Sequence, residues 1–168
     1  MKKFELTSET KINIFGKKLF RIKALISFGD VEAGETGGWV EKEGNVNQSG
    51  DAWVYGNAWV YGNAEVSGNA EVSGDAWVYG NAKVSGNAWV SGDAEVYGNA
   101  DYTTIHGFGT QFRTTTFFRC KDKKVRVACG CFFGTIPEFR EQVKNTRKGK
   151  IAEEYLMIAD LMEKHFEK

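Results

Sequence analysis

The 168-residue sequence contains few of the features that mark secreted or membrane-spanning proteins. It has only three cysteines, Cys120, Cys129 and Cys131, spaced C-x8-C-x-C. This odd, clustered set does not suit the disulfide framework of a secreted domain, so we expect reduced thiols. No apolar run approaches the length that spans a membrane, and the start Met-Lys-Lys-Phe-Glu lacks the apolar core of a signal peptide. We therefore expect a cytoplasmic protein without membrane contact.

Glycine, by contrast, is abundant and periodic. Eleven glycines from Gly38 to Gly98 lie six residues apart, and from Gly50 onward each unit reads Gly-Asn/Asp-Ala-x-Val-Tyr/Ser. Alanine and valine stand two positions apart, so both side chains point to the same side of an extended strand. Gly-Asn and Gly-Asp favour a tight corner. The repeat therefore predicts a chain that coils, with the alanines and valines of residues 52–96 inside.

The pattern V-x-G-N/D-A-x of residues 38–103 resembles the hexapeptide-repeat proteins. This resemblance implies a left-handed parallel β-helix with three hexapeptides per coil, assembled as a homotrimer. The unit 44–49 departs from the pattern because Gln48 stands where valine is expected. We interpret that unit as a frayed or capped first coil.

Three units per coil bring residues eighteen apart into vertical register and sort the outward side chains onto three faces. One face carries tryptophans and tyrosines in rows, a second carries two tryptophans with Glu71, and the third alternates Glu65, Lys83 and Asp101. Exposed aromatic patches are typical of interfaces, although these rings could instead shield the strand backbone at its corners. We predict an oligomer interface formed by Trp53, Trp59, Tyr61, Trp77, Tyr79, Trp89 and Tyr97.

Both ends of the chain depart from the repeat. Residues 11–25 read as two strands around a Gly16-Lys17 turn, which would cap the open first coil. Residues 112–120 and 125–131 alternate like a hairpin, Thr135 caps a helix near Pro137, and a second helix follows from about Ile151. The fold class is all-β with a small α+β C-terminal module. We expect a cap and linker at 1–37, the β-helix at 38–109 and a ββαα module at 110–168.

Charge is distributed unevenly, although the net charge is zero. Residues 44–103 hold seven acidic residues and one lysine, whereas residues 110–150 hold eleven basic residues and three acidic ones. A basic end can attract a host protein, a phosphorylated small molecule or, with less support, nucleic acid. The other interpretation is an ordinary solvated face. The candidate ligand or partner site comprises Arg113, Arg119, Lys121, Lys123, Lys124 and Arg126.

Enzymatic activity has weaker support. The hexapeptide-repeat resemblance implies acyl transfer with a histidine base, for which His106 at the end of the coil is the candidate. No long loop interrupts the repeats to enclose a substrate, and no partner carboxylate is evident near His106. Carbonic anhydrases of this fold use three histidines, but this chain has two, and its cysteines lack paired C-x2-C spacing. We expect neither a metal nor a cofactor.

The whole chain also resembles hexapeptide-repeat proteins carried by phages and prophages of gut-type anaerobic bacteria, a resemblance that implies no activity. Together these observations predict a non-enzymatic, homotrimeric binding protein in a bacterial host cell. Its basic module would meet a host protein or phosphorylated ligand, with a role against antiviral defence. The alternatives are an acyltransferase using His106 and a purely structural phage component.

Overall fold

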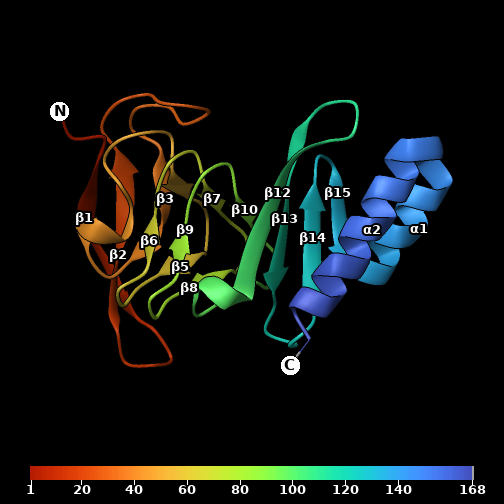
Figure 1. Cartoon of the computed structure of the whole chain (residues 1–168). Coiled ribbons are helices and arrows are strands. Elements are labelled where there is room, and N and C mark those ends of the chain that lie inside the picture. Colours follow the sequence, from red (N-terminus) through yellow and green to blue (C-terminus); the bar gives the residue numbers. More distant parts are fainter. Residues whose placement is uncertain (168) are drawn as a thin grey trace.

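The computed structural model describes residues 1–167, which fold into a β-solenoid, an antiparallel sheet and a pair of helices arranged in that order along one axis (Figure 1). The N-terminal strands are β1 (Phe4–Ile12), β2 (Lys18–Ala24) and β3 (Thr36–Val40). The solenoid strands have two residues each: β4 (Trp53–Val54), β5 (Trp59–Val60), β6 (Glu65–Val66), β7 (Glu71–Val72), β8 (Trp77–Val78), β9 (Lys83–Val84), β10 (Trp89–Val90) and β11 (Glu95–Val96).

The solenoid strands stack in three parallel columns, β3-β5-β8-β11, β4-β7-β10 and β6-β9. From β4 onward partners lie eighteen residues apart, as in Trp59↔Trp77 and Glu65↔Lys83. The alanines and valines of residues 52–96 fill the interior with at most 1% of their surface exposed. Corner glycines such as Gly74 have positive φ, +65° in that case, which L side chains adopt only with strain. The predicted parallel β-helix with three units per coil is confirmed.

The first coil has a different register from the one the sequence predicts. Val40 pairs with Val60 and Val46 with Val66, a separation of twenty residues rather than eighteen. Val46 therefore takes the core position, and Gln48 lies in a two-residue insertion. The prediction that Gln48 replaces a core valine is wrong, because Gly38 and Gly44 do not form corners of the repeat. Gly38 stands opposite Ala58 at an alanine position, and Gly44 is exposed in a short 3-10 helix, Glu43–Asn45.

The N-terminal hairpin caps the first coil, as predicted. β1 and β2 pair antiparallel, and β2 pairs with β3, so the sheet continues past the end of the solenoid. Side chains supply donors to the carbonyls of the open columns. Lys3 Nζ donates to Ala52 O at 2.8 Å, and Asn45 Nδ2 donates to Ala64 O at 2.8 Å. Gln48 Oε1 accepts from the backbone N–H of Lys3 at 2.7 Å and so holds β1 in place.

The C-terminal module is a four-stranded antiparallel sheet with two helices on its outer side (Figure 1). Its elements are β12 (Tyr102–Phe108), β13 (Arg113–Arg119), β14 (Val125–Cys129), β15 (Phe132–Thr135), α1 (Ile136–Thr146) and α2 (Gly149–His165). The inner side of the sheet closes the last coil, where Thr116 Oγ1 accepts from Trp89 N at 3.0 Å. Thr135 caps α1 and accepts from Glu138 N, which confirms the predicted helix start.

Two strands of this module were not anticipated. β12 begins at Tyr102, where the repeat decays, and pairs with β13. The predicted strand 125–131 is too long, because the chain turns at Gly130 with φ +59° and returns as β15. The module is therefore four strands and two helices rather than ββαα.

Candidate functional site

The predicted basic residues lie at two ends of the β13–β14 hairpin, and several contact the solenoid. Lys121 Nζ donates to Asp75 O at 2.7 Å and lies 3.8 Å from the Trp77 ring centroid. Lys123 Nζ lies 3.4 Å from Glu95 Oε2. Both contacts join the β13–β14 turn to the side of the solenoid. Two of the lysines predicted to bind a partner therefore help to hold the module against the solenoid.

Two of the arginines also have partners within the chain. Arg119 Nε lies 3.3 Å from Asp101 Oδ1, and Arg119 donates to Phe166 O at 3.2 Å. Arg126 donates to Asp122 Oδ2 at 2.7 Å, and this hydrogen bond holds the pKa of the Asp122 carboxyl below its usual value. Asp101 therefore pairs with the module and does not continue the predicted row of Glu65 and Lys83 on the third face.

Lys124 and Arg113 remain, and they lie far apart. Lys124 is exposed in the β13–β14 turn, and it forms no ion pair within residues 1–167. Arg113 begins β13 at the opposite end of the hairpin, where its guanidinium lies against Gly130. The structure therefore brings Arg119, Lys123 and Lys124 together but separates Arg113 from them.

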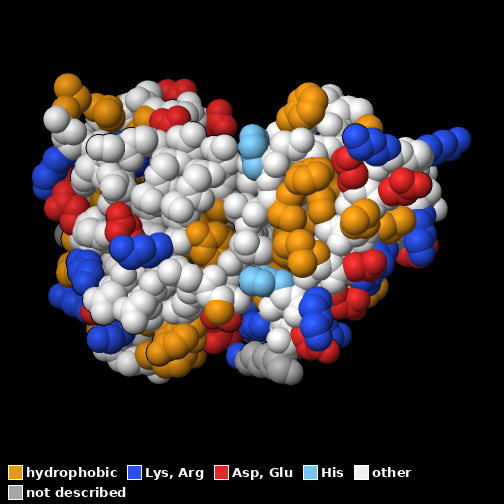
Figure 2. All heavy atoms as spheres, in the orientation of Figure 1, with side chains coloured by type: hydrophobic (Ala, Val, Ile, Leu, Met, Phe, Trp, Pro, Cys, Tyr) orange, Lys and Arg blue, Asp and Glu red, His pale blue; other side chains and the backbone are white. Residues whose placement is uncertain are grey.

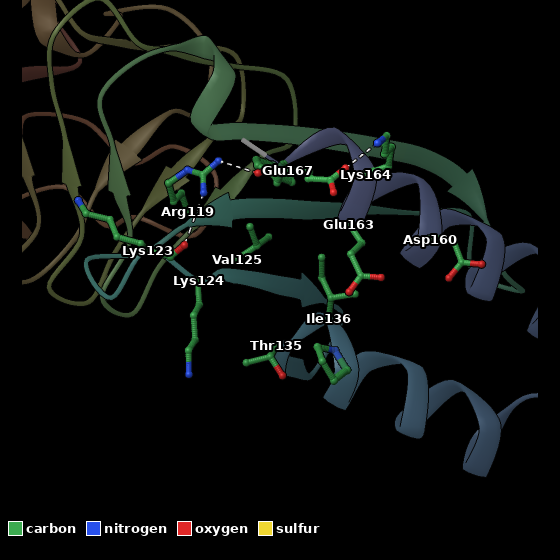
Figure 3. Close-up of a pocket in the computed structure, with 12 residues that line it drawn as sticks. Arg119, Lys123, Lys124, Val125, Thr135, Ile136, Asp160, Glu163, Lys164 and Glu167 are labelled. Carbon is green, nitrogen blue, oxygen red and sulfur yellow. Dashed lines mark hydrogen bonds and ion pairs between the residues drawn. The ribbon is translucent and has the colours of Figure 1, made fainter.

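A groove with a volume of about 880 Å³ runs between the β13–β14 turn and the helices. Figure 3 shows Arg119, Lys123 and Lys124 at one end and Asp160 and Glu163 of α2 at the other. Its apolar surface comes from Val125, Ile136, Pro137 and Phe166. Ligand sites commonly combine such an apolar lining with a few charged groups that fix orientation.

Ion pairs reduce the negative charge at the helical end of this groove. Arg140, whose side chain is 21% exposed, lies 2.8 Å from Asp160 and 2.6 Å from Glu163. Lys164 and Glu167 also pair, at 2.6 Å. The turn end is different, because Lys124 has no such partner in the described part of the chain. An anionic group is therefore favoured beside the turn, and the helical end repels it weakly.

The sequence did not reveal the helical wall of the groove. Lys164 and Phe166 of this wall stand outside the basic hairpin, as does Arg140, which pairs with its acidic residues, and no motif marks them. Helical spacing assigns buried positions on α2, but it does not show which sheet edge the end of that helix approaches.

The predicted interface aromatics form two rows on one solenoid face. Trp59 stacks on Trp77 with centroids 4.9 Å apart, and Tyr61 stacks on Tyr79 at 5.0 Å. Phe15, from the turn between β1 and β2, packs on this face with its centroid 5.7 Å from that of Trp77. Part of the aromatic face is therefore covered by the chain's own hairpin.

The remaining predicted interface residues differ widely in exposure. Trp53 is completely buried under Phe4 and Phe28, whose centroids lie 5.9 Å and 5.3 Å away. A neighbouring chain cannot reach its ring in this arrangement. Trp89 and Tyr97, in contrast, expose 37% and 62% of their surface.

His106, the candidate base, is exposed near the junction of the solenoid and the module. Figure 2 shows the pale-blue histidine atoms near the middle of the face in view. The His106 Nδ1 atom lies 3.0 Å from Thr114 Oγ1, so a hydroxyl rather than a carboxylate orients the ring. His106 lines a shallow groove of about 460 Å³ with Trp89 and Glu71. Burial, with a smaller effect of Asp30, raises the pKa of the Glu71 carboxyl.

The cysteines occupy three different environments. Cys120 is buried, and burial raises the pKa of its thiol to about 11. Cys129 accepts a hydrogen bond from Thr115 Oγ1 at 3.1 Å, and Cys131 is exposed. Across residues 1–167 no three histidine, cysteine or acidic side chains are grouped so that they could hold a metal ion. No helix in the same range is long and apolar enough to cross a membrane.

Comparison with known protein families matches residues 76–92 to the YdcK beta solenoid repeat. The matched segment runs from Ala76, just before β8, through β10, so it supports the solenoid repeat and covers a small part of the chain. No curated protein matches the sequence.

Proposed function

We propose that this protein is a non-enzymatic, homotrimeric binding protein whose C-terminal module holds an acidic segment of a partner protein. The observation that carries the proposal is the groove of about 880 Å³, in which exposed Lys124 has no ion-pair partner among residues 1–167 and stands beside an apolar surface. A carboxylate of the partner would pair with Lys124, and apolar side chains would lie on Val125 and Ile136.

The repeat pattern supports the assembly. The hexapeptide-repeat resemblance implies a homotrimer, which would present three copies of the groove. The resemblance to phage and prophage proteins supports a bacterial host protein as the partner, and interference with antiviral defence as the role. A purely structural phage component would have no ligand for the groove.

The binding test uses a fluorescein-labelled hexaglutamate peptide and measures fluorescence anisotropy. We expect Lys124→Glu to weaken binding about tenfold or more, because a like charge would replace the attraction. Lys123→Glu with Lys124→Glu should weaken it further. Lys144→Glu is the matched control, since this exposed lysine of α1 lies outside the groove.

Added salt should weaken binding of the unmodified protein, because the contact is exposed. Equal affinities of the unmodified protein and Lys124→Glu would contradict the proposal. An absence of binding at millimolar peptide would also contradict it, and would favour the structural role.

A further inference from the structure

A second, smaller pocket lies at the opposite end of β13 and β14 from the groove. It has a volume of about 240 Å³ and is formed by the start of β13, the β14–β15 turn, α1 and α2. The buried rings of Phe139 and Tyr155 meet edge to face in its lining, with centroids 5.8 Å apart and planes at 89°. The pocket therefore has an aromatic floor.

Two arginines from distant parts of the chain line this pocket. Arg113 comes from the start of β13, and Arg147 follows the end of α1. Neither forms an ion pair within residues 1–167; Arg147 donates only to the carbonyl of Thr146, at 3.3 Å. Guanidinium groups are the preferred partners of phosphate oxygens because they present several donors in a planar fork.

Local backbone features help to position the two arginines. A Cβ atom at residue 130 would lie 1.8 Å from an Arg113 guanidinium nitrogen, so glycine at this position gives the arginine its place over the turn. The Arg147 backbone N–H donates to Val143 O at 2.8 Å, which anchors that residue at the end of α1. The Arg113 guanidinium thus lies against the turn, and the backbone of Arg147 is fixed at the end of α1.

Hydroxyl and amide groups complete the lining. Thr110, Gln111, Gln142 and Thr146 stand at the rim, and the Tyr155 hydroxyl lies at the floor. Burial raises the pKa of Tyr155, whereas the positive charges of Arg147 and Arg113 oppose that shift. The neighbouring Cys129 side chain raises this pKa further, so the Tyr155 hydroxyl stays protonated at neutral pH.

Among residues 1–167, no acidic side chain lines the pocket. Two positive charges match the charge of about −2 that a phosphate monoester carries near pH 7. The volume lies below the roughly 300–1,000 Å³ of sites for drug-sized ligands, which limits the occupant to a phosphate and about one ring. We propose that this pocket binds a small monophosphate ester, with its phosphate between Arg113 and Arg147 and its ring against Phe139 and Tyr155.

Isothermal titration of the full chain with phenyl phosphate tests this site. We expect phenyl phosphate to bind, inorganic phosphate to bind about tenfold more weakly because it leaves the aromatic floor uncovered, and phenol not to bind. Equal affinity for phenyl phosphate and inorganic phosphate would overturn the role of the floor. No heat from phenyl phosphate at millimolar concentration would overturn the site.

Substitutions locate the binding within the molecule. Arg113→Gln and Arg147→Gln should each weaken phenyl phosphate binding about tenfold or more. Lys144→Gln removes one positive charge from α1 outside the pocket and should change the affinity less than about twofold. Circular dichroism would detect whether Arg113→Gln disturbs folding. Arg147 is exposed at the end of α1, so the Arg147→Gln variant would still test the site in that case. Unchanged affinity in Arg147→Gln would overturn the proposal.

This inference does not depend on the hexaglutamate groove. Lys124→Glu, at the other end of the hairpin, should leave phenyl phosphate binding intact, so either site can fail while the other stands.

Discussion

The Asn45 side chain replaces a backbone N–H donor at the open end of the β6–β9 column. Its side chain is fully buried, donates to Gly62 O and Ala64 O, and accepts from the backbone N–H of Lys42. A regular coil would satisfy these carbonyls with backbone donors from the preceding strand. A carbonyl that is buried without a hydrogen-bond donor gives up its hydrogen bonds to water and gains none in return, which destabilises the fold.

Replacing Asn45 should therefore destabilise the fold more than replacing a solvent-exposed asparagine of the repeat. We expect Asn45→Ala to lower the free energy of unfolding by about 1–3 kcal/mol. Asn63→Ala is the control, because Asn63 is exposed and its amide contacts Asn81 at 3.3 Å; it should cost less than about 0.5 kcal/mol. Urea unfolding measures both. Similar losses would show that Asn45 is not a special cap.

Lys3 makes the cap sensitive to pH. Burial lowers the pKa of its ammonium group to about 8, with Asp51 partly opposing the shift. Above pH 8 the folded state releases the Lys3 proton while the unfolded chain, with a pKa of 10.5, retains it. The unfolded state then binds more protons, so this group makes stability rise with pH. Buried tyrosines such as Tyr61, whose pKa burial raises to about 12, act in the opposite direction above pH 10.

We expect the free energy of unfolding to increase between pH 8 and pH 9.5 in the unmodified protein. Lys3→Met should be less stable, because the carbonyls of Gly50 and Ala52 lose their donor. Its stability should also rise less with pH, the remaining rise coming from groups such as Lys11, whose pKa burial also lowers. Urea titrations at several pH values give both curves, and parallel curves would contradict the role of Lys3.

At the scale of the coil, the stacking of corners adds a constraint to the conformation that each corner requires. Gly74 and Gly86 have nearly the same φ, +65° and +66°. A Cβ atom at Gly74 would lie 2.8 Å from the backbone nitrogen of Gly92 in the next coil, whereas one at Gly86 would meet nothing within 4 Å. Comparing Gly74 with Gly86 therefore distinguishes the cost of backbone strain from the cost of contact between coils.

Gly86→Ala should cost about 1–2 kcal/mol, the usual penalty for an L residue in the left-handed region. Gly74→Ala should cost at least about 1 kcal/mol more, because the backbone of the next coil must move. Urea unfolding of the two variants measures the difference. If both cost the same, contact between successive corners does not limit the side chain at residue 74.

The local repeat predicted most of the solenoid because corner, strand and core position recur within six residues. It failed where the coil lost that period. Val46 and Gln48 both fit a plausible unit, and only the pairing of Val46 with Val66 decides which one faces the core. β15 was missed because Gly130 interrupts an alternating run, and a glycine in such a run marks either a bulge or a turn.

The basic residues were visible in the sequence, but their partners were not. Lys121 and its acceptor Asp75 lie 46 residues apart, and Lys123 and Glu95 lie 28 apart. The sequence composition shows how many basic residues there are, but it does not show which of them have partners within the chain. Those partners depend on how the module packs against the coils. The pairing of Arg113 with Arg147 in one pocket depends likewise on the end of α1 returning to the start of β13.

At the scale of the molecule, an apolar surface remains beside the aromatic rows. Ile14, Phe15 and Tyr97 expose 73%, 53% and 62% of their surface. Phe15 packs on Tyr79, and Tyr79 contacts Tyr97 with centroids 5.2 Å apart, so the exposed groups are continuous. Contiguous apolar surface of this kind is typical of contacts between proteins. We place the proposed trimer contact here, with Trp89 as a further exposed candidate, rather than at buried Trp53.

The assembly can be tested by sedimentation equilibrium, in which a trimer of 18.7 kDa chains would have a mass of roughly 56 kDa. Trp77→Glu is a poor test, because Phe15 and Lys121 of the same chain pack on that ring. Tyr97→Glu changes a mainly exposed ring, and we expect it to weaken association about tenfold or more by placing a charge in the contact. Ser85→Glu adds the same charge to the third face and should leave the mass unchanged. A monomeric unmodified protein, or a Tyr97→Glu variant that associates normally, would exclude this surface as the trimer contact.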